Sequence, residues 1–152
     1  MENGIKILTI TLLISCVGAF SQVTDSKHPP PQLLAQHFEI TSKIIFTAVE
    51  KGIDEGDVDV FSNYFGNRVY VNLPSGESGY FSANQAYYIL KNYIGVRKPL
   101  GFSFTTLGEA DQIPYATGRA AFRFKGNREF TQVYVALAKS DGKWVIDKIN
   151  LY

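Results

Sequence analysis

Residues 115–151 decide the fold, and they read YATGRAAFRFKGNREFTQVYVALAKSDGKWVIDKINL. Polar and apolar side chains alternate along three segments of this stretch, at 115–125, 128–139 and 143–151, as they do in half-buried strands. Gly126-Asn127 and Asp141-Gly142 separate the segments, and both pairs suit tight two-residue hairpin turns. The stretch therefore predicts three strands of an antiparallel meander. A further strand is expected before them, near residues 102–107.

A long amphipathic helix is predicted over residues 32–51. Its apolar residues recur every three or four positions, which matches the turn of an α-helix. Gly52 is expected to end this helix. The apolar stripe is formed by Leu33, Leu34, Phe38, Ile40, Thr41, Ile44, Ile45, Ala48 and Val49.

A short helix and a pair of strands are expected next. Asp57 suits the N-cap of this helix, and Gly66 suits its C-terminal cap. Residues 68–73 then alternate as a strand does, and a turn at 74–79 leads to a short strand at 80–81.

A third helix is predicted from a capping box. Ser82 and Gln85 have the required spacing, at which the side chain of each residue binds the backbone N–H of the other. Gly95 is expected to end this helix. The order of helix, helix, strand pair, helix and meander predicts an α+β fold, with three helices packed on one face of a bent antiparallel sheet.

Five stretches of the sequence resemble a known family, and they are residues 59–69, 80–86, 102–104, 115–118 and 144–146. Together they resemble domain-of-unknown-function family 4783, an exported bacterial family of the nuclear transport factor 2-like (cystatin-like) superfamily. The resemblance covers about residues 45–152. It implies the cone-shaped fold of that superfamily and a location in the bacterial envelope, and it carries over no catalytic residues.

The N-terminus has the features of a secretory signal peptide. Lys6 precedes an apolar run at residues 7–14, which is shorter than the roughly 20 residues that cross a bilayer as a helix. A small-x-small triplet that ends at Ser21 predicts removal of residues 1–21, after which no stable membrane span remains. The alternative is a lipobox that ends at Cys16, which would then become the lipidated N-terminus of an anchored lipoprotein.

The rest of the chain is predicted to be a tether and one domain. Residues 22–31 are polar and end in three consecutive prolines, which favour an extended segment. Residues 32–152 form the domain. Because Cys16 is the single cysteine of the chain, cleavage leaves a mature protein without a disulfide or a cysteine ligand. We expect an exported protein, periplasmic or secreted.

The charge of the chain is balanced, with 15 Lys and Arg against 14 Asp and Glu. A pI of about 7.8 gives no overall field that would gather nucleic acid or an anionic membrane surface. Arg119, Arg123 and Lys125 form a short basic row on one face of a predicted strand. Phe122 and Phe124 lie on the opposite face, unlike the aromatic rings of an RNA-stacking platform. We therefore expect no nucleic-acid partner.

Acid–base and metal chemistry have few candidate residues. His28 lies in the tether. His37 borders the apolar stripe of the first helix, where we expect a partly buried packing residue and not a general base. A metal site would need a second His or a Cys, and Asp57-Val58-Asp59 does not continue as a calcium loop, so no metal and no cofactor are expected. Asp147 lies in an apolar strand. Strict alternation would turn it toward the core, whereas a bulge would turn it to solvent, and we favour the bulge.

Aromatic residues are abundant, with nine Tyr and eleven Phe. A tyrosine combines apolar area with a hydroxyl that needs a partner when it is buried. Such residues can line a pocket for a small apolar or peptide-like ligand, or they can build a core and a homodimer surface, and both alternatives stay open. The candidate ligand-binding residues are Tyr64, Tyr70, Tyr87, Arg119 and Tyr134, and no residue is assigned to catalysis.

Three functions are compatible with these residues. The first is a non-catalytic small-ligand-binding or protein-interaction module of the envelope. The alternative is a small isomerase- or dehydratase-type enzyme, which would move a proton inside the cone with Asp147 or His37 and a tyrosine hydroxyl. The third is a structural homodimer with a filled interior.

Overall fold

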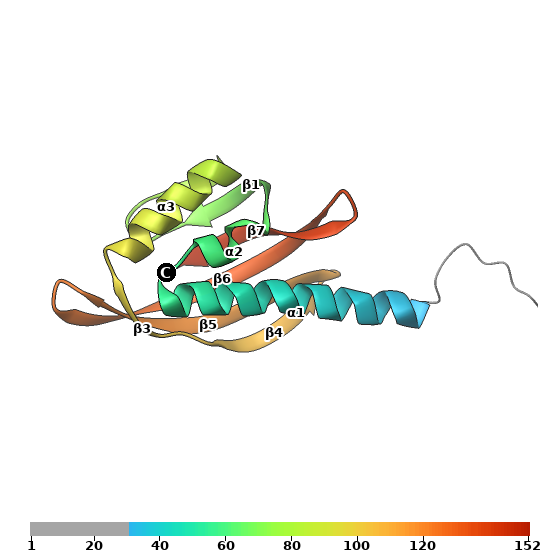
Figure 1. Cartoon of the computed structure of the whole chain (residues 1–152), viewed down its shortest axis with the longest axis horizontal. Coiled ribbons are helices and arrows are strands. Elements are labelled where there is room, and N and C mark those ends of the chain that lie inside the picture. Colours follow the sequence, from blue (N-terminus) through green and yellow to red (C-terminus); the bar gives the residue numbers. More distant parts are fainter. Residues whose placement is uncertain (1–30) are drawn as a thin grey trace, which may run out of the picture.

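The structure of the chain is a computed structural model that describes residues 31–152, with side chains described from Thr41 onward (Figure 1). The predicted signal peptide and its cleavage site lie outside the described residues, as do Cys16, His28 and the side chain of His37. In residues 31–152, no helix has both the length and the apolar character that a bilayer crossing requires.

Three helices lie against one seven-stranded sheet (Figure 1). The elements are α1 (Pro31–Glu55), α2 (Asp59–Ser62), β1 (Phe65–Asn72), β2 (Ser78–Ser82), α3 (Ala83–Gly95), β3 (Lys98–Gly101), β4 (Phe104–Ala110), β5 (Ile113–Phe124), β6 (Asn127–Ser140) and β7 (Lys143–Leu151). The strand order is β2-β1-β7-β6-β5-β3, and β4 also pairs with β5. The predicted α+β arrangement is confirmed.

One strand pair departs from the expected antiparallel sheet. β1 runs parallel to β7, with Val71 opposite Ile149, whereas the other strand pairs of the described sheet are antiparallel. A parallel pair needs a long connection between its strands. The chain provides that connection with α3 and the strands from β2 to β6, so the expectation of an entirely antiparallel sheet is wrong for this pair.

Helix α1 continues through Gly52, where the sequence predicted its end. Gly56 has a φ of +75°, and its N–H donates to the carbonyl of Ile53 at 3.3 Å. The N–H of Asp57 donates to the carbonyl of Gly52 at 2.7 Å, which completes the Schellman motif that ends the helix. Gly52 instead makes room for α2, because a Cβ at this position would lie 2.3 Å from Cδ1 of Phe61.

Helix α2 is a single turn, shorter than predicted. Asp57 accepts the N–H of Asp59 through Oδ1 at 2.9 Å, near the start of the turn. β1 begins at Phe65, so Gly66 lies in a strand and not in a helix cap. The helix is short because β1 already pairs with β7 at this point of the chain.

Helix α3 has the predicted capping box and the predicted end. Ser82 Oγ accepts the N–H of Gln85 at 3.3 Å, and Gln85 Oε1 accepts the N–H of Ser82 at 3.0 Å. The last residue of the helix is Gly95, as the sequence predicts.

Tight turns join the strands of the meander. Asp141 and Gly142 have φ values of 50° and 75°, which confirms the predicted turn between β6 and β7. The turn between β5 and β6 is shifted by one residue. Lys125 and Gly126 form it, with φ values of 49° and 83°, and Asn127 pairs as the first residue of β6. Positive φ at both turn positions fits the right-handed twist of the strands.

Two strands, β3 and β4, replace the one strand expected near residues 102–107. Both pair with β5, and Phe102 and Ser103 separate them. The earlier strand contains Pro99, which has no N–H to donate. β3 tolerates this residue because it lies at the edge of the sheet.

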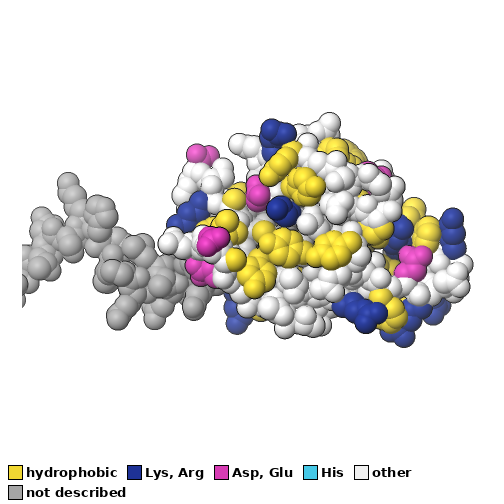
Figure 2. Space-filling model, turned by 180° about the vertical axis from the view of Figure 1, so that it is seen from behind, with side chains coloured by type: hydrophobic (Ala, Val, Ile, Leu, Met, Phe, Trp, Pro, Cys, Tyr) yellow, Lys and Arg dark blue, Asp and Glu magenta, His cyan; other side chains and the backbone are white. Residues whose placement is uncertain are grey.

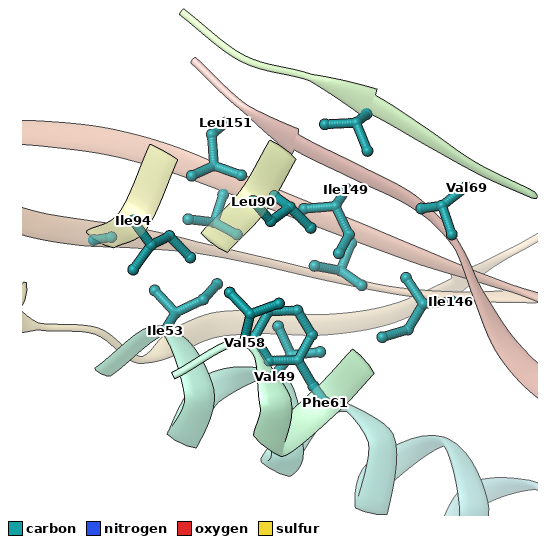
Figure 3. Packing of buried hydrophobic residues seen from close by; sticks show 14 of the residues in the cluster. Val49, Ile53, Val58, Phe61, Val69, Leu90, Ile94, Ile146, Ile149 and Leu151 are labelled. Atoms are coloured by element: carbon teal, nitrogen blue, oxygen red, sulfur yellow. The ribbon is translucent and has the colours of Figure 1, made fainter. Parts of the chain in front are cut away.

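The core lies between the helices and the inner face of the sheet. Figure 3 shows Val49 and Ile53 of α1 and Phe61 of α2 facing Ile146 and Ile149 of β7. Leu90 and Ile94 of α3 belong to the same core. The helices and the sheet therefore share one apolar interior.

The buried face of α1 is displaced from the predicted stripe. Ile45 and Val49 are buried as expected, but Ile44 is 52% exposed, and Ser42 and Phe46 are buried in its place. A 3.6-residue period identifies an apolar face without fixing which flank of that face meets the sheet.

Candidate functional site

The space between the helices and the sheet is filled with apolar side chains, and the largest of them include Phe61 and Phe122. From Thr41 onward, the buried polar residues are Ser42 and Thr131. Proton-transfer catalysis needs an acid or a base beside the reacting atoms. Within the described side chains, the interior holds no buried carboxylate, amine or imidazole.

Two carboxylates of α1 reach the sheet, and both bind backbone amides there. Glu50 Oε2 accepts the N–H of Phe104 at 2.8 Å, and Asp54 Oδ1 accepts the N–H of Phe102 at 2.8 Å. These bonds hold α1 against the segment between β3 and β4. We assign both carboxylates a structural role.

Asp147 lies at the predicted bulge of β7. Lys148 pairs with Ala136, and Ile146 pairs with the next residue of β6, so Asp147 is left out of the pairing. The bulge is therefore confirmed. Ile146 is buried and belongs to the core, whereas Asp147 is half-buried and lies outside it.

The outer face of the sheet, turned away from the helices, carries a row of tyrosines. Five successive cross-strand partners on β5, β6, β7, β1 and β2 are Tyr115, Ala136, Lys148, Tyr70 and Tyr80. Their neighbours along the strands, such as Val71, Val135 and Ile149, are buried in the core, so alternation places the row on the outer face. Figure 2 shows the molecule from behind, with hydrophobic side chains running across its middle.

Tyr134 extends this row along β6. Its ring stacks on that of Tyr115 with a centroid distance of 6.0 Å and an interplanar angle of 20°. At the other end, the rings of Tyr70 and Tyr80 meet edge to face at 5.2 Å and 72°. We call these four residues the tyrosine surface.

Cations lie beside the tyrosine surface. The Nζ atom of Lys148 is 5.5 Å from the ring centroid of Tyr70, and Cζ of Arg68 is 5.2 Å from that of Tyr80. Such contacts are attractive and hold a ring in one orientation at the surface. The Tyr70 hydroxyl also lies 3.3 Å from Oγ of Ser78.

Gly108 allows the ring of Tyr115 to lie flat on β4. The two residues are cross-strand partners, and a Cβ on Gly108 would lie 2.8 Å from both Cζ and the hydroxyl oxygen of Tyr115. A side chain at this position would push the ring outward. The glycine therefore belongs to the construction of the tyrosine surface.

Amide side chains adjoin the rings. Asn150 of β7 pairs with Tyr134 on one side and with Asn72 of β1 on the other. Its Oδ1 atom is buried and accepts no hydrogen bond from the described residues. A buried oxygen without a donor costs about 1–3 kcal/mol. A donor from outside the domain, after a local rearrangement, would offset this cost.

The predicted ligand-binding residues do not form one site. Tyr70 and Tyr134 belong to the tyrosine surface. Arg119 lies on the same face nearer the β5–β6 turn, with Cζ 4.2 Å from the ring centroid of Phe130. Tyr64, between α2 and β1, packs against the core. Of these four residues, two lie on the tyrosine surface, one lies beside Phe130 and one packs against the core.

Tyr87 lies on α3, apart from the other candidates. Its hydroxyl accepts a hydrogen bond from Nζ of Lys91, and this Nζ also lies 3.6 Å from Oδ2 of Asp59 in α2. The Tyr87 hydroxyl, and to a lesser extent the Asp59 carboxylate, raises the pKa of Lys91. Tyr87 therefore helps to join α3 to α2.

The basic row of β5 has a different composition from the one predicted. Arg119 and Arg123 share the outer face, but Lys125 lies in the turn. Phe130 of the neighbouring strand β6 adds an aromatic ring to this face, which the alternation of β5 alone did not reveal.

Tyr80 and Tyr115 were not selected from the sequence as binding residues. Alternation within each strand does place them on the polar face. Their meeting with Tyr70 and Tyr134 depends on the strand order β2-β1-β7-β6-β5, which no local pattern contains.

A comparison with protein families identifies the chain. The model of the family described as domain of unknown function DUF4783 matches residues 46–151. The chain belongs to the DUF4783 family. This confirms the family resemblance seen in the sequence. A search of curated proteins found no match.

Solved structures share the fold of this DUF4783 domain. A DUF4783 protein from Bacteroides uniformis ATCC 8492 has a TM-score of 0.61 at 18% identity, over 69% of this chain and 93% of that chain. One from Bacteroides ovatus ATCC 8483 has a TM-score of 0.59 at 20% identity, over 68% and 90%. A hypothetical protein from Catenulispora acidiphila DSM 44928, with a ketosteroid isomerase-like fold and in complex with trimethylamine, has a TM-score of 0.56 at 12% identity, over 71% and 83%. An NTF-2 like protein of unknown function from Shewanella oneidensis MR-1 also shares the fold, with a TM-score of 0.51 at 12% identity, over 77% of this chain and 98% of that chain. The DUF4783 domain has a nuclear transport factor 2-like fold.

Proposed function

We propose that this DUF4783 domain is a non-catalytic binding module of the bacterial envelope, and that the tyrosine surface binds an extended, peptide-like ligand. One observation carries the proposal, namely the cross-strand register that joins tyrosines of β5, β6, β1 and β2 on the outer face. The location in the envelope rests on the signal peptide predicted from Lys6 and the apolar run that follows it.

The chemistry of this face suits a peptide backbone. Tyrosine rings offer apolar area at low conformational cost, and their hydroxyls donate and accept hydrogen bonds. Asn72, Asn150 and Gln132 add amide groups that can pair with peptide N–H and C=O groups. A face that spans several strands accommodates an extended ligand more readily than a compact one.

The interior supports this proposal more than it supports the enzyme alternative. Fully buried apolar side chains such as Phe61 and Phe122 occupy the space between the helices and the sheet. An isomerase or dehydratase would need a carboxylate or imidazole beside a tyrosine hydroxyl. Asp147 lies outside the core, and the side chain of His37 lies outside the described residues. Binding on the tyrosine surface leaves these core side chains in place.

Selection of peptides from a displayed library on the purified chain tests the proposal. Peptides that bind the tyrosine surface should lose about ten-fold in affinity with Tyr70→Ala or Tyr134→Ala, which corresponds to about 1.4 kcal/mol for a buried aromatic contact. Tyr88→Ala is the matched control, because Tyr88 is an exposed tyrosine on α3. It should leave the affinity unchanged.

Two outcomes would contradict the proposal. In one, no peptide is enriched over an unrelated domain of similar charge. In the other, the selected peptides bind the Tyr70 and Tyr134 variants as tightly as the unaltered chain. Asp147→Asn should leave peptide binding intact, and selective loss of the turnover of any substrate in this variant would favour the enzyme alternative.

A further inference from the structure

A second surface lies on the same outer face, at the end nearest the β5–β6 turn. It consists of the exposed ring of Phe130 and four cations from β3, β5 and β6, which we call the basic cluster: Lys98, Arg119, Arg123 and Arg128. We propose that the basic cluster docks the domain on an anionic lipid surface, with Phe130 entering the headgroup region. This proposal is independent of the tyrosine surface.

Strand pairing forces three of these cations together. Arg123 of β5 is the cross-strand partner of Lys98 on β3 and of Arg128 on β6. Like charges directly opposite each other destabilise a sheet. The arrangement works against the stability of the free domain, and an anion from outside would offset the repulsion.

Carboxylates among the described residues do not pair with the basic cluster. The ion pairs of the described residues are Lys91–Asp59 and Arg97–Glu129, and neither involves the basic cluster. Arg97, by contrast, is a cation with partners inside the domain. Its guanidinium stacks on the ring of Tyr93 at 3.8 Å and lies 3.7 Å from Glu129. The basic cluster lacks such a carboxylate and is directed to solvent.

Phe130 gives the cluster an apolar centre. Its side chain is 51% exposed, and Cζ of Arg119 and Cζ of Arg128 lie 4.2 and 5.0 Å from the ring centroid. These cation–π contacts hold the ring at the surface. Figure 2 shows dark blue side chains close to a hydrophobic one toward the lower right of this face. An anionic lipid surface suits both the cations and the ring of Phe130, since it offers phosphate oxygens to the cations and an apolar boundary to the ring.

The shape of the surface favours a lipid over other anions. The four cations are exposed and stand on neighbouring strands, so no wall encloses a small anion. Among the described residues, Arg119 and Arg128 stack on the single ring of Phe130, which offers no succession of platforms to nucleic-acid bases.

Co-sedimentation of the full chain with vesicles tests the proposal. The anionic vesicles contain equal parts of phosphatidylglycerol and phosphatidylcholine, and the neutral vesicles contain phosphatidylcholine alone. The test variant is the double substitution R123Q/R128Q. The control, K51Q/K143Q, removes the same charge from two exposed positions on α1 and β7. All the proteins carry the same N-terminal segment, so differences between them report on the substituted residues.

Each basic residue near an anionic surface raises membrane partition about five-fold. The test variant should therefore bind anionic vesicles about 25-fold more weakly than the unaltered chain, whereas the control should change by less than about three-fold. Phe130→Ser should also weaken binding, and Tyr70→Ala should not. Binding of the unaltered chain should fall as salt is added.

Three results would overturn the proposal. They are equal binding to neutral and anionic vesicles, an equal loss in the test and control variants, and tighter binding to an oligothymidylate or to polyglutamate than to anionic vesicles. Removal of Arg123 and Arg128 should leave the thermal midpoint unchanged or raise it, because it relieves repulsion. A lower midpoint would show that the two arginines stabilise the fold, and it would also count against the proposal.

Discussion

Replacement of Gly52 by alanine should destabilise the domain, although alanine is the better helix former. In a helix interior, the change alone stabilises by about 1 kcal/mol. Here, however, the added Cβ would lie 2.3 Å from Cδ1 of Phe61 and 2.6 Å from the carbonyl oxygen of Asp57. Phe61 is 1% exposed and cannot swing into solvent, and the second contact is with backbone.

The size of the effect follows from these contacts. Overpacking costs about 1–3 kcal/mol, and two contacts this short place Gly52→Ala at the upper end of that range. After the gain in helix propensity, we expect a net loss of about 2 kcal/mol, and the thermal midpoint should fall by about 6 °C for a domain of this size. Urea denaturation and thermal unfolding measure both quantities.

Gly95→Ala is the control for this prediction. Gly95 is the last residue of α3, and a Cβ there would meet no atom within 4 Å. Its substitution should leave the stability unchanged or raise it. In a Phe61→Leu background, Gly52→Ala should cost less, because the nearest ring atom is gone. A Gly52→Ala variant as stable as the unaltered chain would refute the packing of α1 on α2 described above.

Three further predictions concern the turns and the outer face. Gly142→Val should lower the unfolding free energy by about 1–3 kcal/mol, since its φ of 75° strains a β-branched residue, and unchanged thermal unfolding would show that the last hairpin is misplaced. The Ser75 hydroxyl, more than any other group, lowers the pKa of Glu77, so Ser75→Ala should raise that pKa toward its ordinary value in a carbon NMR titration, and an unchanged titration would contradict the hydrogen bond. Gly108→Ala should lift the half-exposed ring of Tyr115 and weaken peptide binding, with a change in unfolding free energy of less than about 1 kcal/mol, and full peptide affinity would exclude Tyr115 from the binding surface.

Features that depend on local chemistry could be predicted from the sequence. The capping box of Ser82 and Gln85 involves residues three positions apart, and the turn at Asp141-Gly142 requires only two residues that tolerate positive φ. The bulge at Asp147 follows from the need to bury apolar residues on both sides of it. In each case, the deciding interaction lies within a few residues of the chain.

Features that depend on distant contacts could not be predicted in this way. A glycine after an apolar stripe can end a helix or make room for a neighbour, and at Gly52 the choice depends on Phe61. The parallel pairing of β1 with β7 likewise joins the first and last strands of the described chain, which are more than 70 residues apart in the sequence. Local patterns contain no information on either contact.

The candidate site was predicted in part for the same reason. Tyr70 and Tyr134 were selected as tyrosines, and the structure places both on the outer face. Tyr64 and Tyr87 are equally aromatic, yet they pack against the core or join helices. Residue type marks a tyrosine as a candidate, whereas strand order and register decide whether it lies beside other tyrosines on one face of the sheet.

Fluorine NMR can show directly which tyrosines a bound peptide contacts. The chain is labelled with fluorinated tyrosine, each fluorine NMR signal is assigned by a single Tyr→Phe substitution, and a peptide selected on the unaltered chain is titrated. If the peptide binds the tyrosine surface, the signals of Tyr70, Tyr80, Tyr115 and Tyr134 should shift together with one binding constant, while that of the buried Tyr93 should not move. Shifts of Tyr93, with the four outer signals unchanged, would place the ligand inside the cone and contradict the account.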